Sequence, residues 1–197
     1  MNMFRDTRGN SIIEVIVVIV ILSAGIIGTY GILSSGQKLS TTSENRIRAI
    51  NIAREGLEAV ENIRDTNWIK FSSDYDNCWR VQDYNVNCIG NSVTTLTGFN
   101  VLVQSGSLWS LSGAVTGTGA PVYIDANGLT SHSGSNILCG PGKTTDCKTI
   151  FSRGITISYP DSDHMKVKSV VTWTDSSKDG VYTIDLETIL TNWKKKF

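Results

Sequence analysis

The stretch IIEVIVVIVILSAGIIGTYGIL, residues 12–33, contains a single charged side chain, that of Glu14. An α-helix rises 1.5 Å per residue, so this stretch would extend roughly 30 Å, the thickness of the hydrocarbon core of a bilayer. A buried core helix would be shorter or less uniform, and the apolar part of a secretory signal is typically about 7 to 15 residues long. We therefore predict a membrane-spanning helix, with those two structures as the alternatives.

The length and the net charge of the chain limit its possible functions. The chain has 197 residues, enough for one folded domain plus an appendage, and its 18 Lys and Arg residues are balanced by 18 Asp and Glu residues. A formal net charge of zero provides no strong positive field to attract a polyanion. No specific nucleic-acid partner is predicted.

All four cysteines, Cys78, Cys88, Cys139 and Cys147, follow the apolar stretch. Their number is even, and no two of them have the C-x-x-C spacing that zinc sites favour. Two disulfides in an oxidising compartment fit this pattern better than a metal site does. Among the three possible pairings we favour Cys78 with Cys88 and Cys139 with Cys147, because each closes a short loop. Four reduced, buried cysteines are the alternative.

A second helical pattern begins near Ser43 and ends between residues 65 and 68. Apolar side chains recur there at steps of three and four, forming one stripe of Ile47, Ile50, Ala53, Leu57, Val60 and Ile63. The other side carries charges that we interpret as a solvated face: Arg48, Glu55, Glu58, Glu61 and Arg64. This pattern predicts an amphipathic helix continuous with the apolar stretch.

The remainder of the chain is rich in strand signals. Short apolar alternations, such as Phe99, Val101 and Val103, stand among Gly, Ser and Thr residues. Two long strand-like runs, 166–174 and 181–190, predict an antiparallel hairpin that covers the helix. The expected fold class is α+β: a long N-terminal helix, half transmembrane and half amphipathic, packed on an antiparallel β-sheet head.

The residues before the apolar stretch form a short leader, MNMFRDTRG, which ends at Gly9 and is followed by Asn10 and Ser11. Glu14 is the fifth residue after Gly9. This arrangement resembles the class III signal of type IV prepilins, pseudopilins and related filament subunits. In that family a basic leader ends in Gly, Glu is the fifth mature residue, and a membrane-spanning apolar stretch follows. The family usually has Phe or Met where this chain has Asn10, and Thr where it has Ser11.

The resemblance implies a processing route and a set of partners. A prepilin peptidase would cleave between Gly9 and Asn10, and the new N-terminus at Asn10 would usually be methylated. Other pilin subunits and an inner-membrane assembly platform would then build a filament. The chain would begin as a single-pass precursor in the cytoplasmic (inner) membrane, with its head outside the cytoplasm, and end in an extracellular or envelope-spanning filament. The resulting division is leader 1–9, helix 10–67 and globular β-rich head 68–197.

The resemblance also assigns a task to Glu14 and to three glycines. A carboxylate in a membrane is costly, and in a filament core Glu14 would pair with the N-terminal ammonium of another subunit, fixing their stagger. Gly25, Gly28 and Gly31 recur every third residue, which permits either close helix packing or local loosening of the helix. Family members often carry a helix-disrupting Pro at the position of Gly31. A minor pilin or pseudopilin is preferred over a major pilin because of Asn10.

The sequence contains few candidate catalytic or metal-binding residues. The two histidines, His132 and His164, are interpreted as surface loop residues, and no nucleotide-binding, zinc-protease or serine-hydrolase motif is present. Aspartate pairs in two loops are possible calcium ligands, as in the heads of some pseudopilins: Asp161 with Asp163, and Asp175 with Asp179. The five tryptophans are expected in the core or at its rim. We predict no enzyme activity and no cofactor.

Two other functions stay open at this point. A single-pass protein could present an extracytoplasmic binding domain without polymerising, and it would then keep residues 1–9 and tolerate loss of Glu14. A membrane-anchored hydrolase would need His132 or His164 for its activity. The terminal lysines 194–196 are interpreted as a solvated end of the chain.

Overall fold

A computed structural model describes residues 10–91, 99–106, 108–115, 119–175 and 178–194. Contacts divide the chain into two compact units, Met1–Glu44 and Asn45–Phe197. The boundary lies inside a helix, so the unit that holds the sheet also includes the second part of that helix.

Helix α1 runs without a break over Asn10–Lys70, 61 residues. It confirms the predicted continuity of the apolar and amphipathic patterns, and it ends two residues beyond the expected limit of residue 68. All three prolines of the chain, Pro121, Pro141 and Pro160, come later in the sequence. The helix therefore contains no residue that lacks a backbone donor.

The second unit contains a seven-stranded sheet in which every pair of neighbouring strands is antiparallel. Its strands are β1 (Phe99–Ser105), β2 (Leu108–Val115), β3 (Ala120–Ile124), β4 (Thr130–Ser131), β5 (Cys147–Ser158), β6 (His164–Asp175) and β7 (Lys178–Thr191). One edge of β5 pairs with β6, which pairs with β7. The other edge of β5 is shared end to end by β3 and β1, so β5 is the central strand.

The predicted terminal hairpin is confirmed as β6 and β7, in register from His164 opposite Thr191 to Thr174 opposite Val181. Alternate side chains of β7 pack toward the core, namely Tyr182, Ile184 and Leu186. The strand signal at Phe99 is also confirmed, as β1. Within β1, however, Val103 is exposed and Leu102 is buried.

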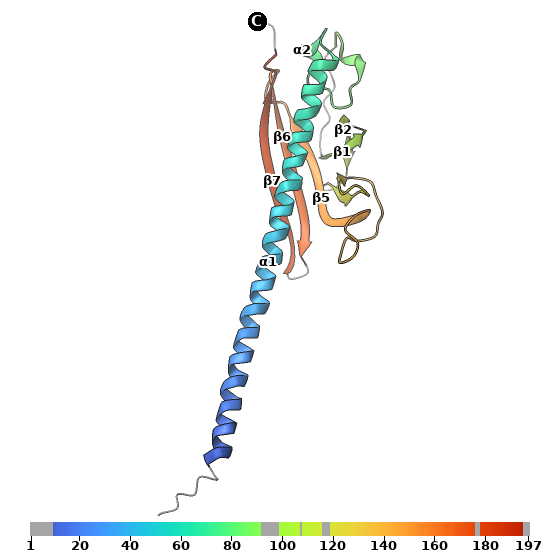
Figure 1. Cartoon of the computed structure of the whole chain (residues 1–197). Helices are drawn as coiled ribbons and strands as arrows, with labels where there is room; N and C mark the ends of the chain where they lie inside the picture. Colours follow the sequence, from blue (N-terminus) through green and yellow to red (C-terminus); the bar gives the residue numbers. More distant parts are fainter. Residues whose placement is uncertain (1–9, 92–98, 107, 116–118, 176–177, 195–197) are drawn as a thin grey trace, which may run out of the picture. The chain divides into compact units, whose positions relative to one another are not determined.

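Within the second unit, α1 lies along the sheet (Figure 1). The buried helix residues include four small ones, Ala49, Ala53, Gly56 and Ala59. The predicted stripe is therefore partly wrong, because Ile47 is 60% exposed and the stripe is centred on these small residues. Small side chains allow the helix backbone to approach the sheet closely.

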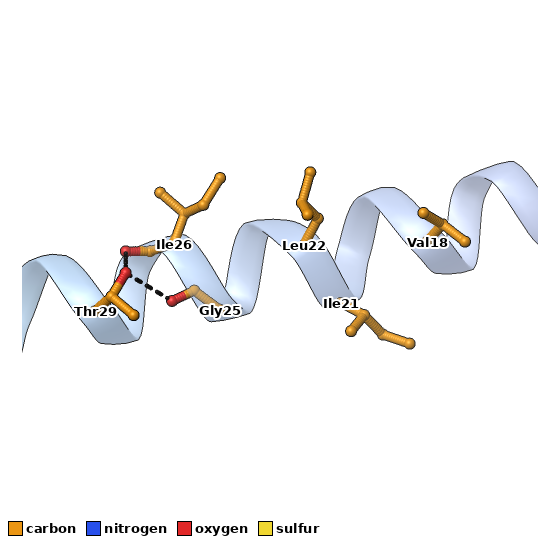
Figure 2. A pocket seen from close by; sticks show the side chains of 6 residues that line it. All are labelled: Val18, Ile21, Leu22, Gly25, Ile26 and Thr29. Atoms are coloured by element: carbon orange, nitrogen blue, oxygen red, sulfur yellow. Dashed lines mark hydrogen bonds between the residues drawn. The ribbon is translucent and has the colours of Figure 1, made fainter.

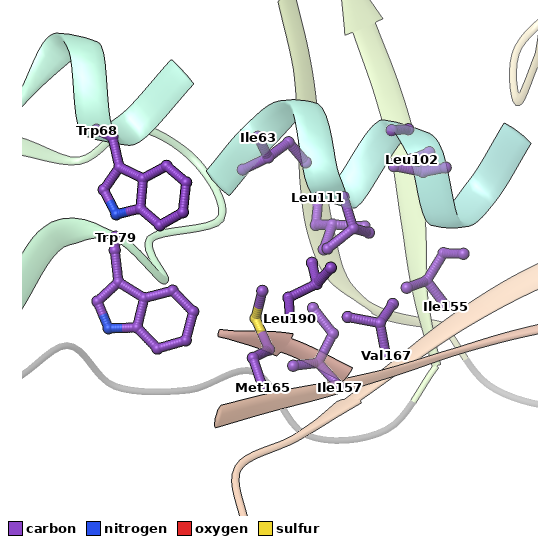
Figure 3. Close-up of a cluster of buried hydrophobic side chains, with 12 residues drawn as sticks. Ile63, Trp68, Trp79, Leu102, Leu111, Ile155, Ile157, Met165, Val167 and Leu190 are labelled. Carbon is purple, nitrogen blue, oxygen red and sulfur yellow. The ribbon is translucent and has the colours of Figure 1, made fainter. Parts of the chain in front are cut away.

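Two hydrophobic clusters join the helix to the sheet. The larger lies near the end of α1, where Trp68, Trp79, Leu102, Ile157 and other side chains meet (Figure 3). Trp68 also donates from Nε1 to Asn192 Oδ1 at 3.3 Å, which ties the end of α1 to the residue that follows β7. The smaller cluster contains helix residues, Val122 of β3, and Phe151 and Trp173 of the adjacent strands β5 and β6.

Two charges predicted on the solvated helix face instead have structural contacts. Arg64 is buried, and its guanidinium lies 4.7 Å from the centre of the Trp68 ring. It also pairs with Glu61 at 3.1 Å and Asp65 at 2.9 Å. Glu55 pairs with the buried Arg153 of β5 at 3.3 Å. The sequence period placed these charges opposite the apolar stripe, but Arg64 is buried beside Trp68, one turn further along the helix, and Glu55 pairs with Arg153 from a strand distant in sequence.

Gly119, immediately before β3, yields a stability prediction. Its φ is +138°, and a Cβ there would lie 2.4 Å from the carbonyl carbon of Arg153 and 2.6 Å from the nitrogen of Gly154. Both are backbone atoms of β5, which cannot turn aside as a flexible side chain can. We expect Gly119→Ala to destabilise the head by about 3 kcal/mol through backbone strain and overpacking. Thermal unfolding should show a midpoint lower by about 6 to 12 °C.

Gly113→Ala in β2 is the matched control for this prediction. A Cβ at Gly113 would meet nothing within 4 Å, so its unfolding free energy should change by less than about 0.5 kcal/mol. Equal midpoints for the two variants would contradict the close approach of Gly119 to β5.

Candidate functional site

The first unit presents an apolar helical surface over residues 12–33. Each large hydrophobic side chain there is between 49% and 76% exposed. Burying such a side chain stabilises by about 1.5–3 kcal/mol, so leaving all of them in water would cost on the order of 20 kcal/mol. Among the described residues, this helix is the one element long and apolar enough to cross a membrane. The segment fits a membrane-anchored protein, with lipid or other helices covering it.

Hydroxyl groups within this segment are satisfied by the helix itself. Thr29 donates from Oγ1 to the carbonyl oxygens of Gly25, at 3.1 Å, and Ile26, at 2.9 Å. Ser23 donates to the carbonyl oxygen of Ile19. Such bonds to the preceding turn remove the need for water, so these hydroxyls add little to the cost of an apolar environment.

Gly25 forms the floor of an open groove on this helix (Figure 2). The walls are almost entirely apolar and come from Val18, Ile21, Leu22, Ile26 and Thr29. Leu22 and Ile26 project on one side and Ile21 on the other. The groove has the form of a hole between helical side chains that a knob from a neighbouring helix can enter.

The three glycines have no function inside this chain that requires them. A Cβ at Gly25, Gly28 or Gly31 would meet nothing within 4 Å, and the helix is unbroken through all three. Each Gly nevertheless weakens a helix by about 1 kcal/mol relative to Ala. A requirement for glycine at these positions would therefore come from something packed against the helix. Of the three, Gly25 alone lines the groove.

The residues predicted to take part in leader cleavage and assembly lie near the N-terminus of the chain. Gly9 lies outside the described residues, and Asn10 is the first residue of α1. Glu14 is exposed one turn further along. Within the described part of the chain, no basic side chain pairs with it. Its carboxylate is therefore displayed on the same surface as the apolar side chains.

Both predicted disulfides are confirmed. Cys78 is bonded to Cys88, with Cα atoms 5.2 Å apart, and Cys139 is bonded to Cys147, with Cα atoms 5.0 Å apart. The first closes the loop that follows α1 and contains the short helices α2 (Tyr75–Cys78) and η1 (Val86–Cys88). The second closes the loop before β5. Both lie in the unit that holds the sheet, which fits an oxidising compartment.

A buried cationic centre joins three parts of the head. Arg153 of β5 is fully buried and donates from Nη1 to the carbonyl oxygen of Ile52 at 3.1 Å. Nη1 also lies 3.3 Å from Oε1 of Glu55, which accepts the hydroxyl of Thr130. The remaining nitrogens, Nε and Nη2, lie 3.3 and 3.2 Å from Nε2 of His132. We call Arg153, Glu55 and His132 the Arg153 cluster.

The placement of His132 corrects the prediction of a surface loop residue. It is partly buried, and its Nδ1 lies 3.0 Å from the carbonyl oxygen of Pro121 in β3. Burial, assisted by the positive charge of Arg153, lowers the pKa of His132 from 6.5 to about 4. Burial also lowers the pKa of Arg153, against the opposing effect of Glu55. His132 is therefore a neutral structural group at pH 7.

Two further structural residues were missed by the sequence reasoning. A Cβ on Gly56 would lie 2.6 Å from Oγ of Ser169 in β6, so α1 approaches the sheet closely at this glycine. Asn67 is fully buried and donates from Nδ2 to the carbonyl oxygens of Trp79, at 3.2 Å, and Val81, at 2.6 Å. A polar or glycine residue on the apolar side of an amphipathic helix is the signal that could have identified both.

The remaining candidate residues have local functions. Asp161 Oδ1 accepts from the nitrogen of Asp163 at 2.9 Å and lies 2.8 Å from Nδ1 of His164, so it caps a turn. His164 is half-exposed, and it is the first residue of β6 instead of the predicted loop residue. The Asp175 and Asp179 side chains lie outside those described. Within the described residues, no group of three or more His, Cys, Asp or Glu side chains is arranged to hold a metal ion.

The tryptophans lie in the core of the head or at its rim, as predicted. Trp68, Trp79 and Trp173 are buried, and Trp109 packs against the core. Trp193 is 64% exposed and meets Trp68 edge to face. The Lys194 ammonium lies over both of those rings, while residues 195–197 fall outside the description.

No protein-family model, curated protein or solved structure matches this chain. The long apolar helix and the antiparallel head are compatible with a pilin-like fold and fit a membrane-anchored protein.

Proposed function

We propose that this protein is a structural subunit of a type IV pilus or a related filament. The observation that carries the proposal is the exposed apolar surface of residues 12–33, which is part of the same continuous helix that packs on the sheet of the head. The leader ending in Gly9, with Glu14 five residues later, supports the same function. A simple membrane anchor would require neither a leader ending in Gly9 nor a glutamate at position 14.

Glu14 has a physical task in this proposal. In an assembled filament the apolar helices bundle in a water-poor core, where a lone carboxylate costs several kcal/mol. Cleavage after Gly9 creates an ammonium at Asn10, and that of an incoming subunit pairs with Glu14 of a subunit already in place. The uncleaved precursor lacks this ammonium. Cleavage is thus the switch from a membrane precursor to a subunit competent for assembly.

The groove at Gly25 gives the helices a means of close contact. In lipid, apolar helices associate through close packing more than through the hydrophobic effect, because lipid tails are as apolar as their side chains. A side chain from a neighbouring helix would fill the groove between Ile21 and Leu22. The helical cost of glycine at positions 25, 28 and 31 would then be offset by packing between subunits.

The partners and location follow from the same proposal. A prepilin peptidase removes residues 1–9, and other pilin subunits and an inner-membrane assembly platform receive the product. The lipid bilayer holds the subunit before assembly, with the disulfide-bonded head outside the cytoplasm. The function is structural rather than catalytic.

The state of the N-terminus tests the proposal. We expect the chain from membranes and from sheared surface material to begin at Asn10, with a mass that fits loss of residues 1–9 and gain of one methyl group. Intact-mass measurement and N-terminal sequencing report both changes. Gly9→Val should block cleavage and leave the chain in the membrane fraction, while Thr7→Ala in the same leader should be processed normally.

A chain that still begins at Met1 would overturn the proposal. The protein would then be a single-pass anchor that presents its head without polymerising. Cleavage at Gly9 without any chain in the sheared fraction would overturn the assembly step and retain the processing step.

A further inference from the structure

The Arg153 cluster joins a helix, a strand and a loop that are distant from one another in sequence. Arg153 belongs to the central strand β5, Glu55 to helix α1, and His132 to the segment that follows β4. Thr130 of β4 also donates to Glu55. The β3–β4 hairpin pairs with β5 through the backbone of β3, and Glu55 and His132 add side-chain contacts that tie it to α1 and to Arg153.

The hydrogen bonds determine the protonation state of His132. Arg153 has donors only, so Nε2 of His132 must accept from it. The carbonyl oxygen of Pro121 is an acceptor, so Nδ1 must carry the proton and donate to it. Both ring nitrogens are thus used, and the ring is neutral. A second proton has only Nε2 to occupy.

Adding that proton would convert a favourable contact into an unfavourable one. Nε2 would change from an acceptor to a donor facing two other donors 3.2 and 3.3 Å away. The imidazolium and the guanidinium would be in direct contact. The carboxylate of the cluster, that of Glu55, already pairs with Arg153.

We propose that the Arg153 cluster is an acid-sensitive clasp. At neutral pH it reinforces the pairing of β3 with β5 and ties the β3–β4 hairpin to α1, and when His132 takes up a proton the hairpin opens more often. The released hairpin would carry Val122 away from its neighbours in the smaller hydrophobic cluster. Ile52 and Phe151, which line an open groove beside Val122, would then be exposed. Acid would thus uncover an apolar surface on the head.

The size of the effect follows from proton linkage. The pKa of His132 is about 4 in the clasped state and 6.5 when the side chain is free in solvent. The released state therefore binds more protons, so the clasp is fully stable above pH 6.5 and weakens as the pH falls from 6.5 toward 4. The equilibrium constant for release should rise about 20-fold between pH 7 and pH 5. Below pH 4 it should change little further.

Amide hydrogen exchange of the full chain in detergent micelles tests the clasp. After correction for intrinsic exchange rates, peptides from residues 119–131 should open about 20-fold more often at pH 5 than at pH 7. Peptides from residues 164–174, in β6, should change much less. His132→Gln, which cannot take up a proton, should abolish the pH dependence, while His164→Gln should retain it.

Two results would overturn the clasp. One is the same pH dependence of exchange at residues 119–131 in wild type and in His132→Gln. The other is an imidazole spectrum in which folded His132 titrates near pH 6.5, or carries its neutral proton on Nε2. The spectrum is measured on wild type, so it decides the question even where the variant fails to fold.

Discussion

Replacing Glu14 by alanine is expected to reduce the filament recovered from the cell surface by about 100-fold or more. Breaking a buried charge pair by removing one partner costs about 3–5 kcal/mol, because the other charge is left in a dry environment. Here the unpaired group is the ammonium of an incoming subunit. A loss of 3 kcal/mol already corresponds to more than a 100-fold change in an equilibrium constant. This prediction depends on the proposed function.

Fractionation measures this effect. The ratio of chain in sheared surface material to chain in membranes should collapse for Glu14→Ala, while membrane insertion persists, since alanine is tolerated in apolar helices. Glu14→Gln retains the shape and removes the charge, so it should fail in the same way. Glu58→Ala, an exposed site on the head portion of the same helix, is the matched control. Normal surface recovery for Glu14→Ala would contradict the counter-charge.

Replacing Arg153 by alanine is expected to destabilise the head by about 4 kcal/mol. The change leaves Glu55 without its cation, removes the donor to the Ile52 carbonyl oxygen, and empties the space of a fully buried side chain. For a domain of this size, that corresponds to a melting midpoint lower by about 8 to 16 °C. The fluorescence of the tryptophans in the head reports the transition.

Two variants determine whether charge pairing is the cause. Arg54→Ala removes an exposed cation from α1 and should shift the midpoint little. Adding Glu55→Gln to Arg153→Ala should restore part of the lost stability, because the unpaired carboxylate is then neutral. A double variant no more stable than Arg153→Ala would show that the lost volume and the Ile52 contact, not the charge pair, account for the effect.

Much of the architecture was predictable because it depends on local patterning. The apolar run and the stripe that follows it specify helix over α1, and alternation specifies the β6–β7 hairpin. The two disulfides were predictable because each joins cysteines close in sequence. In each case neighbouring residues alone carry the signal, through the period of the side chains or the length of a loop.

The helix face was predicted less well, for a physical reason. Large apolar residues suggested that Ile47 belongs to the packed stripe, yet it is exposed. The contact with the sheet instead uses alanines and Gly56, which approaches Ser169 closely. Alanine and glycine contribute little to a hydrophobic pattern in the sequence. Whether they allow close packing depends on the surface of the sheet that faces them. Close approach is a property of two surfaces.

The Arg153 cluster could not be read from the chain at all. Arg153 alternates with Phe151 and Ile155 on the apolar face of its strand, but no residue near it in sequence indicates a partner for its charge, and His132 lies among Ser and Gly residues typical of a loop. Their burial is possible because Glu55 and two backbone carbonyls come together from helix and strand. Local patterning was sufficient for the membrane-spanning helix, the head and their order. The polar interior was decided by tertiary structure, because a buried charge is stable only beside partners that folding brings from distant parts of the chain.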